Sequence, residues 1–253
     1  MSNIHPTAII DTTASIAQGV TIGPYAVIGK NVSIGEGSVI GAHVQIVCNT
    51  SIGSGNNIFA FSVLGGDPAH KQHEKDDETW LEIGNNNIIH EYAVIHRGAK
   101  VCGGKTVIGN HNYIMCYVHI GHDCFIGDHV TMVNNVNLAG SVHIEDYAYL
   151  GAFSACVQRT RVGSSALLNP RMITHRNIMP YMIVEEKKVC GINKIGLERR
   201  GYSSNDIEKI RQHYRLICRE GMLFKDVKDT LGRMECEYAK YLATFLDYGP
   251  VLR

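Results

Sequence analysis

An aliphatic residue at every sixth position constrains the fold of this chain more than any other feature. A period of six fits neither an α-helix nor a long strand. It fits a short strand with inward side chains, followed by a tight turn in which Gly or Asn tolerates a positive φ. Three such units make one triangular coil, so the repeat predicts a parallel β-solenoid of about ten coils. The repeat positions are Ile16, Ile22, Ile28, Ile34, Ile40, Ile46, Ile52, Ile58 and Leu64, then Ile83, Ile89 and Ile95, then Ile108, Ile114, Ile120, Ile126, Met132, Leu138, Ile144, Leu150, Cys156, Val162 and Leu168.

Many units carry Gly directly after the aliphatic residue, as in VTIGPY and VSIGEG. This pattern resembles the hexapeptide-repeat family, which implies a left-handed parallel β-helix and a homotrimer. The hand comes from the resemblance alone, because the general preference for right-handed crossovers would predict the opposite. The fold class is therefore mainly β, with the β-helix assigned to residues 1–190.

Two stretches break the repeat, from Gly65 to Leu81 and from His96 to Val107. Insertions into a solenoid leave it as loops, and loops on a rigid scaffold often carry function. We expect both stretches to project from the solenoid.

The pattern changes again in the C-terminal part, residues 191–253, where we expect a small α-helical domain. Ser203 and Asp206 have the spacing of a helix cap, and the apolar residues after them recur on one helical face. A second amphipathic segment is predicted from Leu223 to about Leu246.

Charge and composition exclude several classes of function. Lys plus Arg equals Asp plus Glu, at 24 each, so no global field favours nucleic acid or a membrane surface. No apolar run approaches the roughly 18 residues of a transmembrane segment, and we expect a cytoplasmic protein. The eight cysteines include no C-x-x-C pair, so we interpret them as small core hydrophobes.

The densest group of chemical side chains lies in the string YVHIGHDCFIG. Ile120 is a core position, so His119 and His122 lie outside the core, with His122 in a turn. A surface histidine is the ordinary interpretation of such a position. The neighbouring Asp123 favours a general base, because a carboxylate fixes the tautomer of an imidazole and raises its basicity.

Nearly the whole chain resembles the UDP-N-acetylglucosamine O-acyltransferase family, which begins lipid A synthesis. The resemblance rests on IHPTAIID, VIHRG, HIGHDC, NNVNLAGSV and GINKIGLERRGYS. It implies that His122 deprotonates the sugar 3-hydroxyl for attack on an acyl thioester, that Asp123 supports His122, and that the N–H of Gly140 binds the oxyanion. It also implies acyl carrier protein as the donor and UDP-N-acetylglucosamine as the acceptor, with no metal and no cofactor.

The same resemblance assigns substrate-binding residues less evenly. Lys71 matches a loop lysine that meets the nucleotide sugar, although Lys75 is a rival and the usual aspartate two residues earlier is Ala69. Histidines of the family are replaced by Ser141 and Val157, which suggests an altered acceptor or rate. The remaining matches are His119 and Gln158 in the cleft, and Asn193, Arg199 and Arg200, which resemble residues that hold nucleotide phosphate and carrier protein.

A local basic patch accompanies these matches and favours docking of an acidic carrier protein, although an ordinary solvated surface is equally consistent with it. Its members are Arg159, Arg161, Arg171, Arg176, Lys187, Lys188, Lys194, Arg199 and Arg200.

Three other functions remain to be weighed. A γ-type carbonic anhydrase needs two zinc-binding histidines five residues apart, and no two of the thirteen histidines have that spacing. A catalytically weak paralogue and an acyltransferase acting on the 3-amino analogue of the sugar both stay open, because either could explain Ser141 and Val157.

Overall fold

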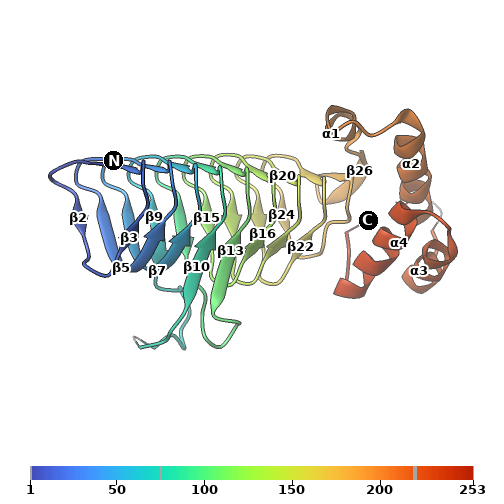
Figure 1. The fold of residues 1–253 in the computed structure, drawn as a ribbon. Coiled ribbons are helices and arrows are strands. Elements are labelled where there is room, and N and C mark those ends of the chain that lie inside the picture. Colours follow the sequence, from blue (N-terminus) through green and yellow to red (C-terminus); the bar gives the residue numbers. More distant parts are fainter. Residues whose placement is uncertain (1, 75, 219–220, 253) are drawn as a thin grey trace.

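A computed structural model describes residues 2–74, 76–218 and 221–252, and shows a three-sided solenoid with helices at its C-terminal end (Figure 1). One face is a parallel sheet to which a final antiparallel strand is added. In spatial order it contains β1 (Asn3–Ile4), β4 (Thr21–Ile22), β6 (Val39–Ile40), β8 (Asn57–Ile58), β11 (Ile88–Ile89), β14 (Tyr113–Ile114), β17 (Thr131–Met132), β20 (Tyr149–Leu150), β23 (Leu167–Leu168), β25 (Met182–Glu185) and β26 (Lys188–Ile192).

The other two faces form one continuous sheet, because the long strands β5 and β7 turn the corner between them. Its strands are β2 (Ile9–Ile10), β3 (Ser15–Ile16), β5 (Val27–Ile34), β7 (Gln45–Ile52), β9 (Val63–Gly66), β10 (Trp80–Ile83), β12 (Val94–His96), β13 (Lys105–Ile108), β15 (His119–Ile120), β16 (Phe125–Ile126), β18 (Asn137–Leu138), β19 (His143–Ile144), β21 (Ala155–Cys156), β22 (Arg161–Val162) and β24 (Ile173–Thr174).

The predicted repeat positions form the core of the solenoid. Ile28, Ile46 and Leu64 lie in successive coils and are almost fully buried, and the later repeat positions behave alike. Burying aliphatic side chains in this way stabilises a fold by about 1.5–3 kcal/mol each. The hexad prediction of the fold is thus confirmed.

The turns differ from the sequence prediction. Positive φ angles fall mainly on residues other than Gly and Asn, and many of these are aromatic. Tyr25, His43, Phe61, Tyr92 and Tyr117 stack in one column along a corner, with ring centroids 4.9–5.2 Å apart. These aromatic residues thus adopt a positive φ that glycine would adopt more readily, and their rings stack on those of neighbouring coils.

Glycine after the aliphatic residue has a different role. A Cβ added to Gly29 would lie 1.8 Å from the carbonyl oxygen of Val47 in the next coil. The close approach of neighbouring coils, and not a positive φ, requires glycine at this position.

A buried asparagine ladder keeps the register across both insertions. The side-chain oxygen of Asn56 accepts hydrogen bonds from the backbone and side chain of Asn87, 31 residues later. The oxygen of Asn87 in turn accepts from the backbone N–H of Asn112, 25 residues later. Adjacent regular coils are 18 residues apart, as for Asn112 and Val130. The extra residues leave the solenoid as loops, as predicted.

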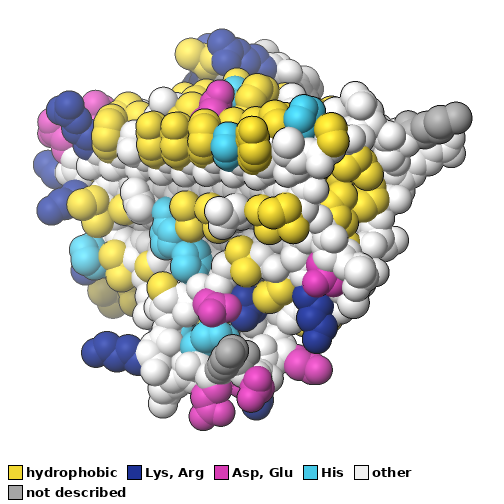
Figure 2. Space-filling view, turned by 90° about the vertical axis from the view of Figure 1, so that its left-hand side faces the viewer, with side chains coloured by type: hydrophobic (Ala, Val, Ile, Leu, Met, Phe, Trp, Pro, Cys, Tyr) yellow, Lys and Arg dark blue, Asp and Glu magenta, His cyan; other side chains and the backbone are white. Residues whose placement is uncertain are grey.

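Both loops project from the same side of the solenoid, near β10 and β13 (Figure 1). Seen from the N-terminal end, acidic side chains gather at the bottom, where these loops lie (Figure 2). The prediction that the cysteines are core residues holds for Cys124 and Cys156, in which burial raises the thiol pKa to about 12. Cys218 and Cys236 are partly buried and pack against the core. The prediction is wrong for Cys48, Cys102, Cys116 and Cys190, which lie outside it.

The C-terminal helices are α1 (Lys194–Arg199), α2 (Ser204–Cys218), α3 (Phe224–Arg233) and α4 (Glu237–Phe245), followed by the 3-10 turn η1 (Leu246–Tyr248). The predicted cap is present, since the Ser203 hydroxyl accepts a hydrogen bond from Asp206 N–H at 3.1 Å. The single segment predicted from Leu223 to Leu246 is wrong. Met234 and Cys236 have extended backbone conformations, and the break lets α3 and α4 pack against each other.

No helix within the described ranges is both long enough and apolar enough to cross a bilayer. The division of the chain at residue 190 stays a prediction, since β26 runs from Lys188 to Ile192 and α1 begins only at Lys194.

Candidate active site

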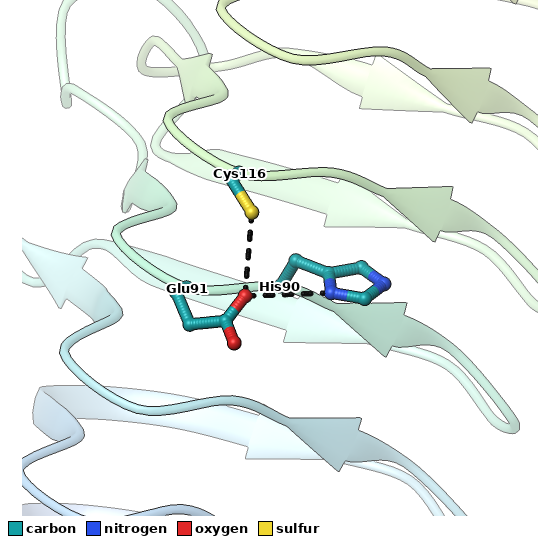
Figure 3. Close-up of side chains that lie close together, drawn as sticks. All are labelled: His90, Glu91 and Cys116. Carbon is teal, nitrogen blue, oxygen red and sulfur yellow. Dashed lines mark hydrogen bonds and ion pairs between the residues drawn. The ribbon is translucent and has the colours of Figure 1, made fainter.

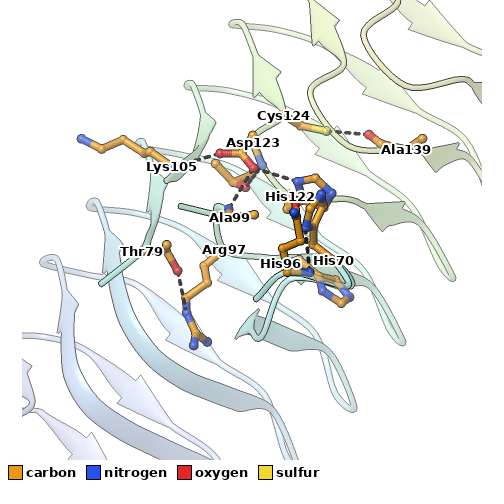
Figure 4. A network of polar contacts seen from close by, with 12 residues as sticks. His70, Thr79, His96, Arg97, Ala99, Lys105, His122, Asp123, Cys124 and Ala139 are labelled. Atoms are coloured by element: carbon orange, nitrogen blue, oxygen red, sulfur yellow. Dashed lines mark hydrogen bonds and ion pairs between the residues drawn. The ribbon is translucent and has the colours of Figure 1, made fainter. Parts of the chain in front are cut away.

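His122 and Asp123 occupy the turn that follows β15, and they form a hydrogen-bonded pair (Figure 4). The Nδ1 atom of His122 lies 2.7 Å from Oδ2 of Asp123. Because an ionised carboxylate only accepts hydrogen bonds, Nδ1 carries the proton, and Nε2 is left as the acceptor. His122 is 6% exposed, so this acceptor lies in a largely water-shielded position. The arrangement can act as a general base.

Backbone groups of the second loop hold the Asp123 carboxylate. Its Oδ2 accepts from the N–H of Ala99 at 2.8 Å, and its Oδ1 accepts from the N–H of Lys105 at 3.2 Å. The N–H of Asp123 donates to the Thr106 hydroxyl at 2.8 Å. These contacts fix the carboxylate, which in turn orients the His122 ring. Sequence analysis missed them, because backbone donors carry no residue signature.

Gly140 lies directly against His122, one coil later. A Cβ at this position would be 2.4 Å from Cε1 and 2.5 Å from Nε2 of the imidazole. The ring therefore covers this turn, and any larger residue would displace it. Within the described part of the chain no acceptor engages the N–H of Gly140, so this N–H can bind a developing oxyanion beside the base.

His122 and Gly140 line one pocket of about 610 Å³, a size typical of small-molecule sites. The pocket brings together five residues predicted from the sequence, namely Lys71, His119, His122, Gly140 and Gln158. Lys75 lies outside the described residues. The first loop forms one wall of the pocket with residues 69–72.

Arg97 anchors that first loop. Its buried side chain donates to the Thr79 hydroxyl at 3.0 Å and to the carbonyl of Gly65 at 3.1 Å, and pairs with Asp67 at 2.5 Å. Arg97 belongs to the second insertion, so one side chain ties the two loops together at the pocket.

Other histidines surround the base. His70 packs edge-on against His122, with ring centroids 5.2 Å apart, and His96 packs in the same way against His119. Burial lowers the pKa of both His96 and His119, and neighbouring histidines lower it further. The lowered pKa favours the neutral form of both rings, which can make hydrogen bonds without adding charge. Sequence analysis missed His70, whose only signal was its place beside Lys71.

The remaining predicted residues lie elsewhere. Asn193, Arg199 and Arg200 line a second pocket of about 700 Å³, over the face that contains β17, β20 and β23. His119 and Gln158 belong to the neighbouring face. The residues matched to the family thus form two groups on different faces of one chain.

The residues of the second group also have structural contacts. The Asn193 side chain accepts from Gly196 N–H at 3.1 Å, which caps α1, and donates to the carbonyl of Ser165 at 2.9 Å. Arg200 stacks over Tyr147 at 4.7 Å, and burial lowers the pKa of its guanidinium. Arg199 is exposed.

The predicted basic patch needs one correction. Arg161 pairs with Glu145 at 2.6 Å and stacks over Tyr248 at 3.7 Å, so its charge is already engaged. Most of the other patch residues are exposed.

Two family models match the chain. One, described as Udp N-acetylglucosamine O-acyltransferase, Domain 2, matches residues 177–249, and the other, Bacterial transferase hexapeptide (six repeats), matches residues 13–48. The second falls on the first coils, and the predicted left-handed β-helix is confirmed.

Relatives match along almost the whole length. The acyl-[acyl-carrier-protein]–UDP-N-acetylglucosamine O-acyltransferase of Janthinobacterium sp. (strain Marseille) is 42% identical, covering 99% of this chain and 98% of the relative. The enzyme of the same name from Burkholderia lata is 46% identical, covering 92% of this chain and 90% of the relative. Among solved structures, the UDP-N-acetylglucosamine acyltransferase of Francisella novicida is 40% identical with a TM-score of 0.95. The match covers 96% of this chain and 91% of the Francisella chain. The Moraxella catarrhalis enzyme is 35% identical with the same TM-score, covering 99% of each chain. This chain therefore belongs to the acyl-[acyl-carrier-protein]–UDP-N-acetylglucosamine O-acyltransferase family.

Proposed function

We propose that the protein transfers a 3-hydroxyacyl group from acyl carrier protein to the 3-hydroxyl of UDP-N-acetylglucosamine, the first step of lipid A biosynthesis. The names of the relatives give the coarser activity, O-acyl transfer between an acyl-[acyl-carrier-protein] and UDP-N-acetylglucosamine. The observation that carries the proposal here is the pocket in which a carboxylate-held histidine packs directly against Gly140. The proposed substrates, acyl carrier protein and a nucleotide sugar, support a cytoplasmic location, which we propose as well.

His122 acts as the base in this mechanism. Its Nε2 takes the proton of the sugar hydroxyl while the oxygen attacks the thioester carbonyl. The tetrahedral oxyanion is stabilised by the N–H of Gly140. Collapse of the intermediate breaks the carbon–sulfur bond, and the departing carrier thiolate receives the proton from His122. Asp123 keeps the imidazole in the required tautomer and stabilises its transient positive charge.

We further propose that the complete site lies between subunits of a homotrimer. One subunit contributes the pocket with Lys71, His119, His122 and Gln158, and its neighbour contributes Asn193, Arg199 and Arg200. The location of these groups on different faces supports this arrangement, because one chain cannot place both around one ligand. A groove between two solenoids would also enclose an acyl chain better than one flat face.

A mixing experiment tests the shared site. His122→Ala and Arg199→Glu variants are each expected to be inactive, and the two are co-expressed to give mixed trimers. A groove is intact when its base comes from the Arg199→Glu chain and its arginine from the His122→Ala chain. Random mixing therefore restores about a quarter of the wild-type activity. Activity no higher than that of the single variants would refute the shared site.

A direct assay tests the reaction itself. Acyl transfer from 3-hydroxyacyl carrier proteins is measured to UDP-N-acetylglucosamine and to its 3-amino analogue, for the wild type and His122→Ala. Transfer to the hydroxyl sugar that collapses in the variant supports the proposal. Transfer only to the amine would keep the mechanism and change the acceptor, as Ser141 and Val157 suggest. Binding of both substrates without transfer would mark a non-catalytic paralogue.

A further inference from the structure

The second loop brings a cysteine next to the proposed catalytic pair. Within this loop the N–H of Cys102 donates to the carbonyl of Ala99 at 2.8 Å, and Gly103 and Gly104 follow with φ angles of +141° and +79°. This turn places the Cys102 thiol so that its sulfur, a ring nitrogen of His122 and a carboxylate oxygen of Asp123 all lie within 4.8 Å of one another.

Thiolate, imidazole and carboxylate are the three side-chain ligands that zinc uses in proteins. We propose that Cys102, His122 and Asp123 form an inhibitory site for a borderline divalent cation of the Zn²⁺ type. With the thiol and the carboxyl both ionised, the ligands carry two negative charges, which the cation neutralises. Three protein ligands leave the fourth tetrahedral position to water.

The required movement is small. With zinc–ligand bonds of about 2.0–2.3 Å, two ligand atoms on one tetrahedral zinc ion lie roughly 3.3–3.6 Å apart. From a starting separation of at most 4.8 Å, the sulfur must approach by no more than about 1.5 Å, and Nδ1 and Oδ2 must open by about half an ångström from 2.7 Å. Cys102 lies in a partly exposed turn that can supply the shift, whereas Asp123 is held by the N–H groups of Ala99 and Lys105 and by the Thr106 hydroxyl.

A cation at this site blocks catalysis whichever ring nitrogen of His122 it binds. A cation on Nδ1 replaces the proton shared with Asp123, and a cation on Nε2 occupies the base itself. The inhibition rests on the proposed role of His122, but metal binding does not, so the two can be tested separately.

The chain offers a matched control site. His90, Glu91 and Cys116 form a second group that offers the same three kinds of ligand atom, with the Cys116 sulfur 3.3 Å and His90 Nδ1 3.5 Å from one Glu91 oxygen (Figure 3). This group does not line the pocket of His122. A cation bound there should leave acyl transfer unchanged.

The first experiment detects the metal without activity. Metal-free full-length protein is titrated with Co²⁺, which reports thiolate ligation by a charge-transfer absorption band. We expect the band to appear in the wild type and in Cys116→Ser, and to be absent when Cys102→Ser is added to Cys116→Ser. The double variant is needed because a cobalt ion at the control site would give Cys102→Ser a band of its own. No band, a band lost in Cys116→Ser alone, or a band that persists in the double variant overturns the site.

The second experiment measures inhibition of acyl transfer by Zn²⁺. Cys102→Ser should retain basal activity and raise the inhibitory Zn²⁺ concentration by a factor on the order of ten or more, because one ligand is lost. A chelator should restore the wild-type rate, and Cys116→Ser should respond as the wild type does. A Cys102-dependent band without inhibition would overturn the inhibitory role and count against His122 as the base. If no acyl transfer is found at all, the cobalt spectrum still decides the metal site.

Discussion

Replacing Gly140 with alanine should disable the enzyme by displacing the His122 ring. The added Cβ would lie 2.4 Å from Cε1 of the imidazole, whereas ordinary contacts begin near 3.4 Å. The ring must therefore move by about 1 Å, which also stretches its 2.7 Å hydrogen bond to Asp123 beyond useful length. A misplacement of this size costs about 100-fold in rate, or about 2.7 kcal/mol of transition-state stabilisation.

The assay compares initial rates of acyl transfer for the wild type and Gly140→Ala at saturating UDP-N-acetylglucosamine. Gly191→Ala is the matched control, because an added Cβ there meets nothing within 4 Å. The control should keep the wild-type rate. Thermal unfolding of each variant shows whether a lost rate reflects a displaced ring or a lost fold.

A double-mutant cycle isolates the clash. Overpacking of this kind costs about 1–3 kcal/mol of stability. In the His122→Ala background the ring is absent, so adding Gly140→Ala should cost almost nothing further in the free energy of unfolding. The reasoning is refuted if a folded Gly140→Ala keeps a kcat within about threefold of the wild type, or if its stability cost persists without the ring.

Three other predictions follow from single contacts. Asp123→Asn places an NH₂ group against a backbone N–H donor and should lower kcat by about 10²–10⁴-fold with little change in KM; an unchanged kcat would contradict the role of Asp123. Ser203→Ala removes the cap of α2 and should lower the free energy of unfolding by about 1 kcal/mol in a denaturant titration, with activity unchanged. Burial lowers the pKa of His143 to about 4, so the fold favours its neutral form. Stability should fall as the pH drops from about 6.5 towards 4, and His143→Asn should flatten this part of the profile.

The solenoid could be predicted from the sequence because its period is set by side chains alone. Ile28, Ile46 and most other inward repeat positions are aliphatic, and the same pattern continues after each insertion. The break near Met234 could not be predicted, because the apolar pattern on either side is compatible with one helix, and only packing of α3 on α4 separates them.

The candidate site was predictable where a side chain carries the chemistry, as for His122 and Asp123. The parts of the site that backbone groups form could not be predicted. The N–H groups of Ala99 and Lys105 that hold Asp123 depend on the path of a loop, and this path has no residue pattern of its own. Sequence analysis assigned Cys102 to the core, because the sequence does not show the loop turn that brings its sulfur near His122 and Asp123.

The two insertions, more than the coils, distinguish this molecule from a plain solenoid. The coils supply His122 and Gly140 at a fixed separation, but a turn histidine in a hexad repeat would otherwise lie exposed. The second loop fixes the partner carboxylate of His122, and the first loop closes the pocket with residues 69–72. Arg97 comes from the second loop and holds the first through Gly65 and Asp67, so one buried side chain ties the wall of the pocket to the loop that supports the base. Catalytic function in this fold therefore depends on the very segments that interrupt its repeat.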